Sequence, residues 1–271
     1  MNEYRLELDC IMDQIELFST KLVPTNRNFK RTEFDDFIKT KVKLDANNEF
    51  GKPKGTYITY DIKNEQDTKS LIVDFRKEIK KIIGRASRVL VVGIGNDVLL
   101  SDSLGPKVVN NLDINTDSNN KFYKFCPNVA SNTGIDSFDI IKSVVNITKP
   151  EIIIAIDSLA SRNFNRVGTS FQISDSGMVP GSGCGKKNQF MLNKETLGVP
   201  VIAIGVPMVV HIKSYLYEVL SSINMEQTNL LNILSNENLN ALNGVILAPK
   251  EIDIILDFCA KIILGVLNGL T

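Results

Sequence analysis

The sequence predicts an α/β protein of three layers, in which a mainly parallel, twisted sheet carries helices on both faces. From residue 88 onward, short apolar segments alternate with segments of helical periodicity, the pattern of repeated strand–helix units. One of these segments, EIIIAI at residues 151–156, is apolar after its first residue, as strands buried on both faces are. Apolar residues make up 43% of the 271-residue chain, which allows a sizeable core.

The N-terminal part of the chain has the weakest pattern. Residues 10–18 carry apolar side chains at helical spacing, but the stretch that follows is broken around Pro24 and indicates a mobile or partner-docked segment. We therefore divide the chain into two parts. The first is an N-terminal segment, residues 1–50, interpreted as a pro-segment or a partner-docked segment, and the second is a single α/β domain, residues 51–271.

Within this domain, β-rich or apolar runs predict strands, and apolar residues three or four apart predict helices. The predicted strands are residues 55–62, 88–93, 121–125, 151–156, 168–174, 199–205 and 244–249. The predicted helices are residues 70–84, 103–112, 135–145, 213–223, 225–234 and 250–270. Gly84 ends the first of these helices, and Pro249 stands near the start of the last.

Composition excludes several classes of partner and location. Lys plus Arg and Asp plus Glu are equal at 31 each, which argues against nucleic acid or an anionic membrane as the main partner. No two of the four cysteines form a Cys-x-x-Cys pair, so we expect reduced thiols in a cytoplasmic protein. The N-terminus is too acidic for a signal peptide, and no apolar run is long enough to span a bilayer.

Two glycine-rich stretches resemble phosphate-binding loops without completing the pattern. VVGIGNDVLLSDSLGP, residues 91–106, has Gly93 and Gly95, but Val98 stands where a dinucleotide fingerprint needs its third glycine. The stretch GMVPGSGCGKK, residues 177–187, lacks the Gly-Lys-Ser/Thr ending of a P-loop. We interpret it as a wall of a peptide-binding groove, where glycine lets another backbone approach, and its cysteine as an inert thiol.

Carboxylates are the candidates for acid–base chemistry, because the chain has one histidine. His211 is interpreted as a capping or packing residue at the start of a helix. Asp102 and Asp157 each follow an apolar strand or its exit loop, where ligands collect in open α/β sheets. For each, two interpretations stay open, a desolvated catalytic carboxylate or a helix or turn cap. If the two are neighbours, they share a proton and form an acid–base pair.

Several long motifs, in order, resemble the germination protease family of spore-forming bacteria. The matching segments are GKPKGTYIT, VLVVGIGNDVLLSDSLGPKVV, NTGIDSFDII, PEIIIAIDSLASRNFNRVGTSFQISDSGMVPGSGCGKKN, ETLGVPVIAIGVPMVV and LAPKEIDIILDFCAKIILGVLNGL. The piece GIGN…SDSLG is also similar to the hydrogenase-maturation peptidases, which share this α/β fold. The resemblance implies an atypical aspartic-type endopeptidase, without metal or cofactor, that degrades small acid-soluble spore proteins.

The resemblance also assigns site residues. It implies catalytic roles for Asp102, in Ser-Asp-Ser-Leu-Gly-Pro, and Asp157, in Ile-Asp-Ser-Leu-Ala-Ser-Arg. Substrate-binding or scaffold roles fall on Gly93, Gly95, Asn96, Ser158, Arg162, Gly181, Ser182, Gly183 and Pro207. It further implies a homotetramer located in the spore or forespore, and a zymogen that trims its own N-terminus.

For the trimming site, the sequence RTEFDDF offers Glu33–Phe34, and the alternative is a solvated helix start capped by Thr32.

Departures from the family pattern keep three hypotheses open. Ser101 replaces a proline, Gly183 is followed by Cys184-Gly185-Lys186 in place of Val-Gly-Asn, and the segment after Pro207 ends in His211 in place of aspartate. The first hypothesis is a divergent, active endopeptidase. The second is an inactive paralogue that binds a spore protein or peptide. The third, a metal-assisted peptidase, needs a histidine ligand, and only His211 is available.

Overall fold

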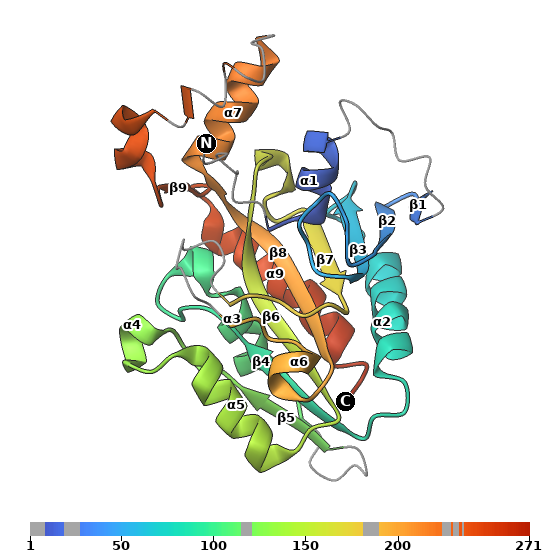
Figure 1. The fold of residues 1–271 in the computed structure, drawn as a ribbon. Coiled ribbons are helices and arrows are strands. Elements are labelled where there is room, and N and C mark those ends of the chain that lie inside the picture. The colour runs from blue at the N-terminus through green and yellow to red at the C-terminus, as the bar shows by residue number, and fades with distance from the viewer. Residues whose placement is uncertain are drawn as a thin grey trace.

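A computed structural model describes residues 9–18, 28–114, 121–180, 190–223, 229, 233–234 and 236–271. These residues form one nine-stranded sheet with the order β1-β2-β3-β7-β8-β6-β4-β5, in which β9 pairs with β8 (Figure 1). The strands are β1 Phe29–Glu33, β2 Phe37–Leu44, β3 Gly55–Ile62, β4 Arg88–Gly93, β5 Lys121–Phe125, β6 Ile152–Ser161, β7 Ser170–Ser174, β8 Val201–His211 and β9 Ile246–Leu247.

Helices cover both faces of the sheet, and the predicted α/β class is confirmed. One core lies between the sheet and α2, α3 and α9, and a second lies between the sheet and α5 and α6. Figure 1 shows α5 and α6 in front of the sheet and α3 and α9 behind it. The helices are α1 Ile11–Phe18, α2 Lys69–Ile83, α3 Leu104–Asn111, α4 Ala130–Thr133, α5 Ser137–Thr148, α6 Lys194–Leu197, α7 Ile212–Ser222 and α9 Ile252–Leu267.

The prediction of a mainly parallel sheet is wrong. Three strand pairs are parallel, β4–β5, β4–β6 and β6–β8, and five are antiparallel. One reason is the short connection between β6 and β7, residues 162–169, because a parallel return needs a crossover of a dozen or more residues. The N-terminal strands β1, β2 and β3 add a further antiparallel meander beside β7.

Residues 29–44, which gave no clear pattern, form the β1–β2 hairpin at one edge of the sheet. Thr32 lies within β1, so the helix start capped by Thr32 is not formed. Lysines alternate with inward-facing residues in β2, and Lys39 reaches Asp74 and Glu78 on α2. The period of two is therefore present in KTKVKL, and two of its lysines, Lys39 and Lys41, pair with Glu78 on the neighbouring helix α2.

Strands β6 and β8 both extend beyond their predicted ends, and the candidate site lies beside the added part of β6. β6 was predicted to stop at Ile156 but continues to Ser161, and β8 continues to His211. The two extensions pair with each other, whereas the pairing of β4 with β6 ends at Gly93 and Ile156. Beyond that point one edge of β6 has no neighbouring strand among the described residues.

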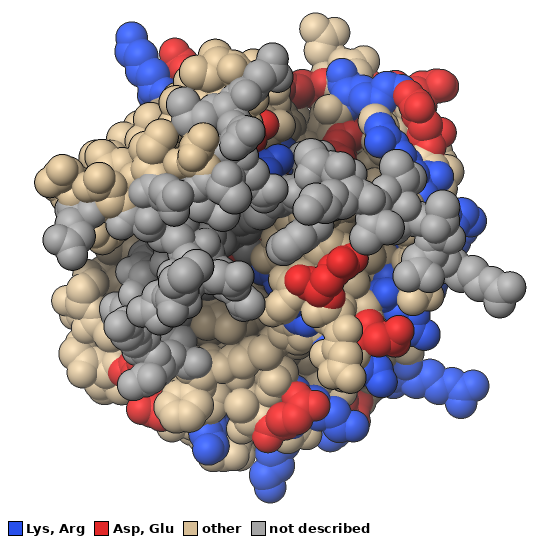
Figure 2. Space-filling view, turned by 45° about the horizontal axis from the view of Figure 1, so that its top comes forward, with Lys and Arg blue, Asp and Glu red and all other residues tan. Residues whose placement is uncertain are grey.

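The surface agrees with the balanced charge of the chain. On the face in Figure 2, acidic and basic side chains stand close together, mostly along the right and lower margins, and an area without charged side chains lies on the left. None of the helices in the described ranges has the length and apolar character needed to cross a membrane. The helix predicted at residues 225–234 lies largely outside the described residues.

Candidate active site

The turn after β4 brings α3 tightly against the ends of the parallel strands. Gly95 has φ +120°, and a Cβ on it would lie 1.9 Å from the backbone oxygen of Asp102. A Cβ on Gly93 would lie 2.4 Å from the backbone oxygen of Gly105, at the start of α3. Both positions need glycine because backbone packs directly on backbone. The glycines therefore position Asp102 at the carboxyl end of β4, beside the point in β6 where its pairing with β4 ends.

Asp102 does not act as a cap for α3. It ends a short 3₁₀ turn, Leu100–Asp102, and its Oδ2 accepts a hydrogen bond from the backbone N–H of Asn96 at 2.9 Å. Ser103 occupies the cap position of α3 without a side-chain capping bond. Burial raises the pKa of Asp102, and the hydrogen bond from Asn96 opposes this rise in part.

Asp157 lies inside β6, one residue past the end of the β4–β6 pairing, so of the two interpretations left open the one in which it caps a turn does not hold. Only 3% of its surface is exposed. Its Oδ1 accepts the N–H of Ser158 at 2.9 Å. The hydroxyl oxygen of Ser158 is itself buried and has no hydrogen-bond partner among the described residues.

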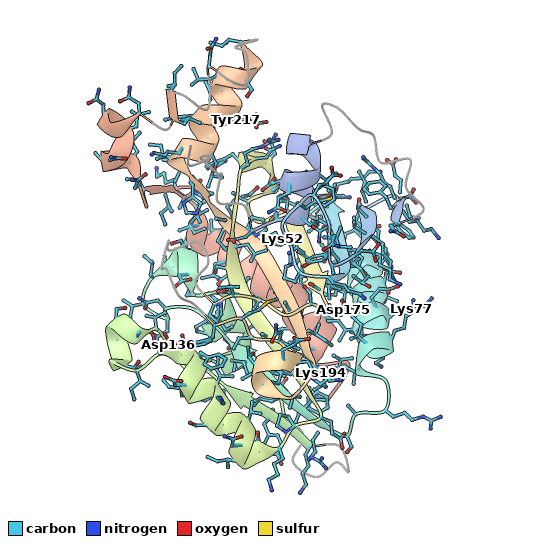
Figure 3. All side chains as sticks on the ribbon, in the orientation of Figure 1. Lys52, Lys77, Asp136, Asp175, Lys194 and Tyr217 are labelled. Carbon is cyan, nitrogen blue, oxygen red and sulfur yellow. The ribbon has the colours of Figure 1, made fainter. Side chains whose placement is uncertain are left out.

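Asp102 and Asp157 line one pocket of about 270 Å³. Asp136 lies on its opposite wall, at the start of α5, and Figure 3 marks its position on the α4–α5 side of the sheet. Among the described residues that line the pocket, three are aspartates and none is lysine or arginine. An acidic, partly desolvated pocket of this kind favours proton sharing between carboxylates.

Two further predicted site residues, Gly95 and Asn96, line this pocket, whereas its aromatic residues and Asp136 were not predicted from the sequence. Phe138 and Phe190 stack with ring centroids 4.9 Å apart and form an apolar wall beside the carboxylates. Asp136 caps α5 by accepting the N–H of Phe138 at 2.8 Å. The pattern of Asp136 ahead of an apolar helical run is an N-cap signal, and it was available in the sequence.

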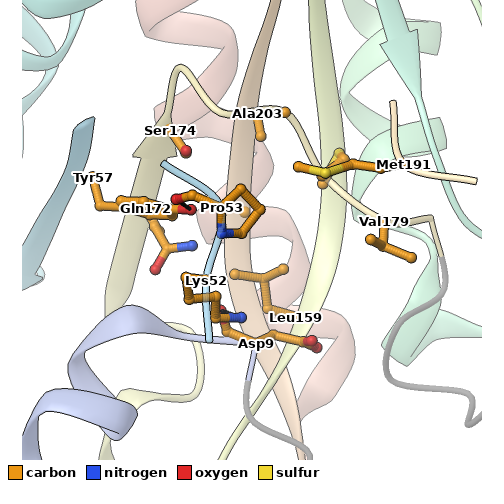
Figure 4. A pocket seen from close by; sticks show the side chains of 13 residues that line it. Asp9, Lys52, Pro53, Tyr57, Leu159, Gln172, Ser174, Val179, Met191 and Ala203 are labelled. Carbon is orange, nitrogen blue, oxygen red and sulfur yellow. Dashed lines mark hydrogen bonds between the residues drawn. The ribbon is translucent and has the colours of Figure 1, made fainter. Parts of the chain in front are cut away.

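A second, smaller pocket of about 110 Å³ lies on the same face of the sheet (Figure 4). Asp157, Gly205 and Gln172 stand side by side on β6, β8 and β7, and Gln172 and Gly205 line this pocket. Lys52 closes one end, where its Nζ donates to the backbone oxygen of Asp9 at 3.0 Å. Burial lowers the pKa of Lys52.

The open edge of β6 is capped by carboxylates. The N–H groups of Ser158, Ala160 and Arg162 donate to Asp157, Asp9 and Asp13 at 2.9, 2.9 and 2.8 Å. Asp9 and Asp13 come from the N-terminal segment. Asp13, fully buried, also accepts the Ser161 hydroxyl at 2.7 Å and pairs with Arg166 at 3.1 Å.

The remaining predicted site residues lie apart from the aspartates or outside the described residues. Arg162 pairs with Glu218 at 3.0 Å and lies over the ring of Tyr217, and it lines neither pocket. Pro207 stands opposite Leu159 at a bulge between β6 and β8. Three of the predicted residues fall outside the described residues, as do Cys184 and Lys186 that follow them: Gly181, Ser182 and Gly183.

His211 ends β8 at the start of α7, is buried, and makes no side-chain capping bond, so it packs and does not cap. Within the described ranges, no group of three or more histidine, cysteine or acidic side chains is arranged to hold a metal ion.

Fold and site together define an α/β protein with two aspartates in one pocket at the carboxyl edge of parallel strands. The chain belongs to the germination protease family, because the family profile described as "Germination protease" matches residues 25–223. It is 33% identical over 300 residues to the germination protease of Caldanaerobacter subterraneus subsp. tengcongensis, covering 95% of this chain and 91% of that protein.

Two further comparisons were found. The germination protease of Clostridium acetobutylicum is 35% identical over 260 residues, covering 80% of this chain and 78% of that protein. The solved structure of the [NiFe] hydrogenase maturation protease HycI from Thermococcus kodakarensis is 17% identical and covers 70% of this chain and 98% of its own. Its TM-score of 0.38 is too low to support an inference about function.

Proposed function

We propose that the chain is a peptide-bond hydrolase of the germination protease type, in which Asp102 and Asp157 activate water. The observation that carries the proposal is that the two carboxylates come from different elements and line the same pocket. The carboxyl edge of parallel strands is where open α/β sheets bind their ligands. Two acids in a desolvated pocket divide the roles of acid and base when they share one proton.

In the proposed step the shared proton starts on Asp102, whose pKa is raised by burial, and the roles of the two carboxyls exchange if it starts on Asp157. Ionised Asp157 then takes a proton from water as the water oxygen attacks the peptide carbonyl carbon, and Asp102 donates its proton to the carbonyl oxygen. When the C–N bond breaks, the proton held by Asp157 passes to the leaving amine, and the oxygen of the tetrahedral intermediate returns its proton to Asp102. One water is consumed, and one carboxyl and one amine are formed.

The geometry of the sheet gives room for an extended substrate. Asp157, Gly205 and Gln172 lie on successive strands, so Gln172 is about 10 Å from Asp157 at roughly 4.8 Å per strand. That distance is about three residues of an extended peptide. We propose that a peptide whose scissile bond lies in the first pocket places a nearby side chain in the second pocket, passing over Leu159, which covers Gly205.

The finer assignments rest on the family. The relatives are named germination proteases, and we propose small acid-soluble spore proteins as substrates, a cytoplasmic location within the spore or forespore, and a homo-oligomer, tetrameric by resemblance. We also propose that residues 1–50 act as a pro-segment ahead of the peptidase domain, residues 51–271.

Cleavage of a purified small acid-soluble spore protein, followed by mass spectrometry, tests the proposal. We expect discrete fragments that persist when a chelator is present. Asp102→Asn and Asp157→Asn should each lower kcat by roughly 10²–10⁴-fold, because each removes half of an acid–base pair. The double variant should lose little more than either single variant, since the pair acts as a unit.

Asp139→Asn is the matched control, because Asp139 is an exposed carboxylate on α5 that lines neither pocket. Full activity in either single variant, or loss of cleavage with the chelator, contradicts the aspartate pair.

One observation favours a second candidate function, an inactive paralogue that binds a spore protein or peptide. Asp157 exposes only 3% of its surface, which restricts the approach of water. Two measurements separate the two functions. An inactive paralogue leaves the mass of the spore protein unchanged in the cleavage assay, and it retains the spore protein in a pull-down.

A further inference from the structure

A set of asparagines ties the two walls of the aspartate pocket together. The first wall is the turn after β4, with Asn96 and Asp97, and the second is the segment around α4, with Asn128 and Asn132. The Nδ2 of Asn132 donates to Oδ1 of Asn96 at 3.2 Å and to Oδ1 of Asn128 at 2.9 Å. The Nδ2 of Asn128 donates to Oδ1 of Asp97 at 3.1 Å. We call these four residues the asparagine bridge.

The bridge ends on the group that binds Asp102. The backbone N–H of Asn96 donates to Oδ2 of Asp102 at 2.9 Å. The side chain of Asn96 is held from two directions, by the N–H of Val98 at 3.0 Å and by Asn132. The hydrogen bond from Asn132 fixes the side chain of Asn96. Because this side chain is attached to the backbone of the same turn, fixing it also restricts the direction of the Asn96 N–H that faces Asp102.

The segment that carries the bridge has a backbone suited to asparagine. Asn128 has φ +62°, in the left-handed region that asparagine tolerates better than most residues. Its Oδ1 accepts the N–H of Val129 at 2.8 Å as well as the amide of Asn132. Val129, Ala130 and Ser131, between the two asparagines, line the aspartate pocket. The bridge thus holds one wall of the pocket at a fixed distance from the other.

We propose that Asn132 is a positioning residue, which acts through Asn96 to hold the Asp102 carboxylate in place for proton exchange with Asp157. The inference deepens the proposed function and rests on it for its catalytic part. Asn132 touches neither aspartate in any contact seen among the described residues, so its effect is indirect. The assignment rests on the two hydrogen bonds that join the segments, from Asn132 to Asn96 and from Asn128 to Asp97, and on the bonds from Asn132 to Asn128 and from Val98 to Asn96 that hold them in place.

The charges around Asp102 make its titration a sensitive readout of this arrangement. Among the described residues, the ionisable groups that line or adjoin its pocket are Asp157 from β6, Asp136 from the start of α5 and Asp97 from the turn after β4, and Lys142 of α5 lies over the ring of Phe138. With no lysine or arginine among the described lining residues, the Asn96 N–H is the group that opposes the effect of burial. Loosening that N–H raises the pKa of Asp102 further.

The test compares Asn132→Leu, which keeps the size of the side chain and removes its amide, with Asn132→Gln, which restores an amide donor. The carboxyl carbon of Asp102, assigned in ¹³C-aspartate-labelled protein with the Asp102→Asn variant, is titrated by NMR. We expect the midpoint to rise by about half a pH unit or more in Asn132→Leu and to return toward the wild-type value in Asn132→Gln. In the pH profile of kcat/KM, the inflection that reports the titration of Asp102 should shift to higher pH in Asn132→Leu. The value of kcat/KM at the optimum pH should fall roughly three- to tenfold.

The control variant is Asn111→Ala, because Asn111 is an exposed asparagine on α3 whose amide donates to Lys107 and which lines neither pocket. It should leave both the titration and the pH profile unchanged. An unchanged Asp102 midpoint in Asn132→Leu, even with a lower melting temperature, overturns the positioning role. If the wild-type protein cleaves no substrate, the proposed function fails, and the NMR titration alone then decides the inference.

Discussion

At the scale of single residues, Gly95 determines where Asp102 stands. Its φ of +120° is outside the range of most side chains, and a Cβ would lie 1.9 Å from the Asp102 backbone oxygen. The glycine is needed for two separate reasons, the conformation of the turn and the contact between two backbones. This explains why a stretch that begins like a nucleotide-binding loop needs no third glycine, because its glycines pack against a helix start.

Gly95→Ala should disturb the site more than glycine replacement elsewhere. Strain at the φ angle and the steric clash together should lower the free energy of unfolding by roughly 2–5 kcal/mol, and displacement of Asp102 should reduce any peptidase activity. Gly84→Ala is the control, since Gly84 also has a positive φ, +62°, but open space around its Cβ position. Chemical denaturation of both variants checks this, and equal losses of stability contradict the role of the close contact.

At the scale of elements, a charged cluster fastens α2 to the strand β2. Glu78 on α2 is buried and bonds Lys81 at 2.7 Å and Lys39 at 3.0 Å, with Lys41 at 3.6 Å. Burial alone raises the pKa of Glu78, but the hydrogen bonds from Lys81 and Lys39, with their charges, outweigh it and bring the pKa to about 2. The ionised carboxylate is therefore part of the folded structure.

The cluster predicts how stability depends on acid. Because the pKa of Glu78 falls from 4.5 to about 2 on folding, its contribution is present above pH 4.5 and is lost as pH falls from 4.5 toward 2. Glu78→Gln should be less stable than wild type at pH 7, and the difference should shrink toward pH 3. Urea midpoints at pH 7, 4.5 and 3 measure this, with Glu195→Gln, at an exposed position on α6, as the control. A constant difference across these pH values argues against it.

Some strand ends are determined by the local sequence, and others are determined by pairing with distant parts of the chain. The strands at residues 55–62 and 121–125 were predicted with their observed ends, because period and turn residues are local. The continuation of β6 through Asp157 was not, since it depends on β8, whose extension pairs with it over 40 residues later in the chain. The candidate aspartates were found from motif and strand position, whereas Asn128 and Asn132 act through bonds that no sequence period records.

At the scale of the whole molecule, the described parts of the N-terminal segment, residues 9–18 and 28–50, pack against the rest of the sheet. Asp13 is buried against the end of β6, and its carboxylate pairs with Arg166 at 3.1 Å. Apolar residues of α1 form a core cluster with β2 and β3. Arg166 also pairs with Asp61 at 3.1 Å, so removing Asp13 takes away one of its two carboxylate partners, and we expect a loss of stability below the roughly 3–5 kcal/mol of a fully unpaired buried charge.

This arrangement predicts what self-cleavage would produce. The proposed site, Glu33–Phe34, lies where β1 ends, and Phe34 is 38% exposed. After a cut there, residues 1–33 should stay bound and co-elute with the remainder in gel filtration, as the contacts of α1 and β1 persist. N-terminal sequencing of aged, acidified protein should find both Met1 and Phe34 as N-termini.

In Asp13→Ala the cleaved fragment should separate, whereas in Asp35→Ala, an exposed position in the β1–β2 turn, it should not. Release of the fragment from the otherwise unchanged protein contradicts the docking, and the absence of a Phe34 N-terminus from protein that cleaves its substrate contradicts the processing.

The carboxylates along β6 also bear on how the protein behaves at high concentration. A strand edge with a row of unpaired N–H groups can pair with a strand from another molecule. Proteins limit such pairing by covering their edge strands or by placing charged side chains on them. Here Asp9 and Asp13 occupy the N–H groups of Ala160 and Arg162 and place negative charge where an incoming carbonyl would dock. We therefore expect that a variant without the N-terminal segment self-associates at this edge to an extent that rises with its concentration.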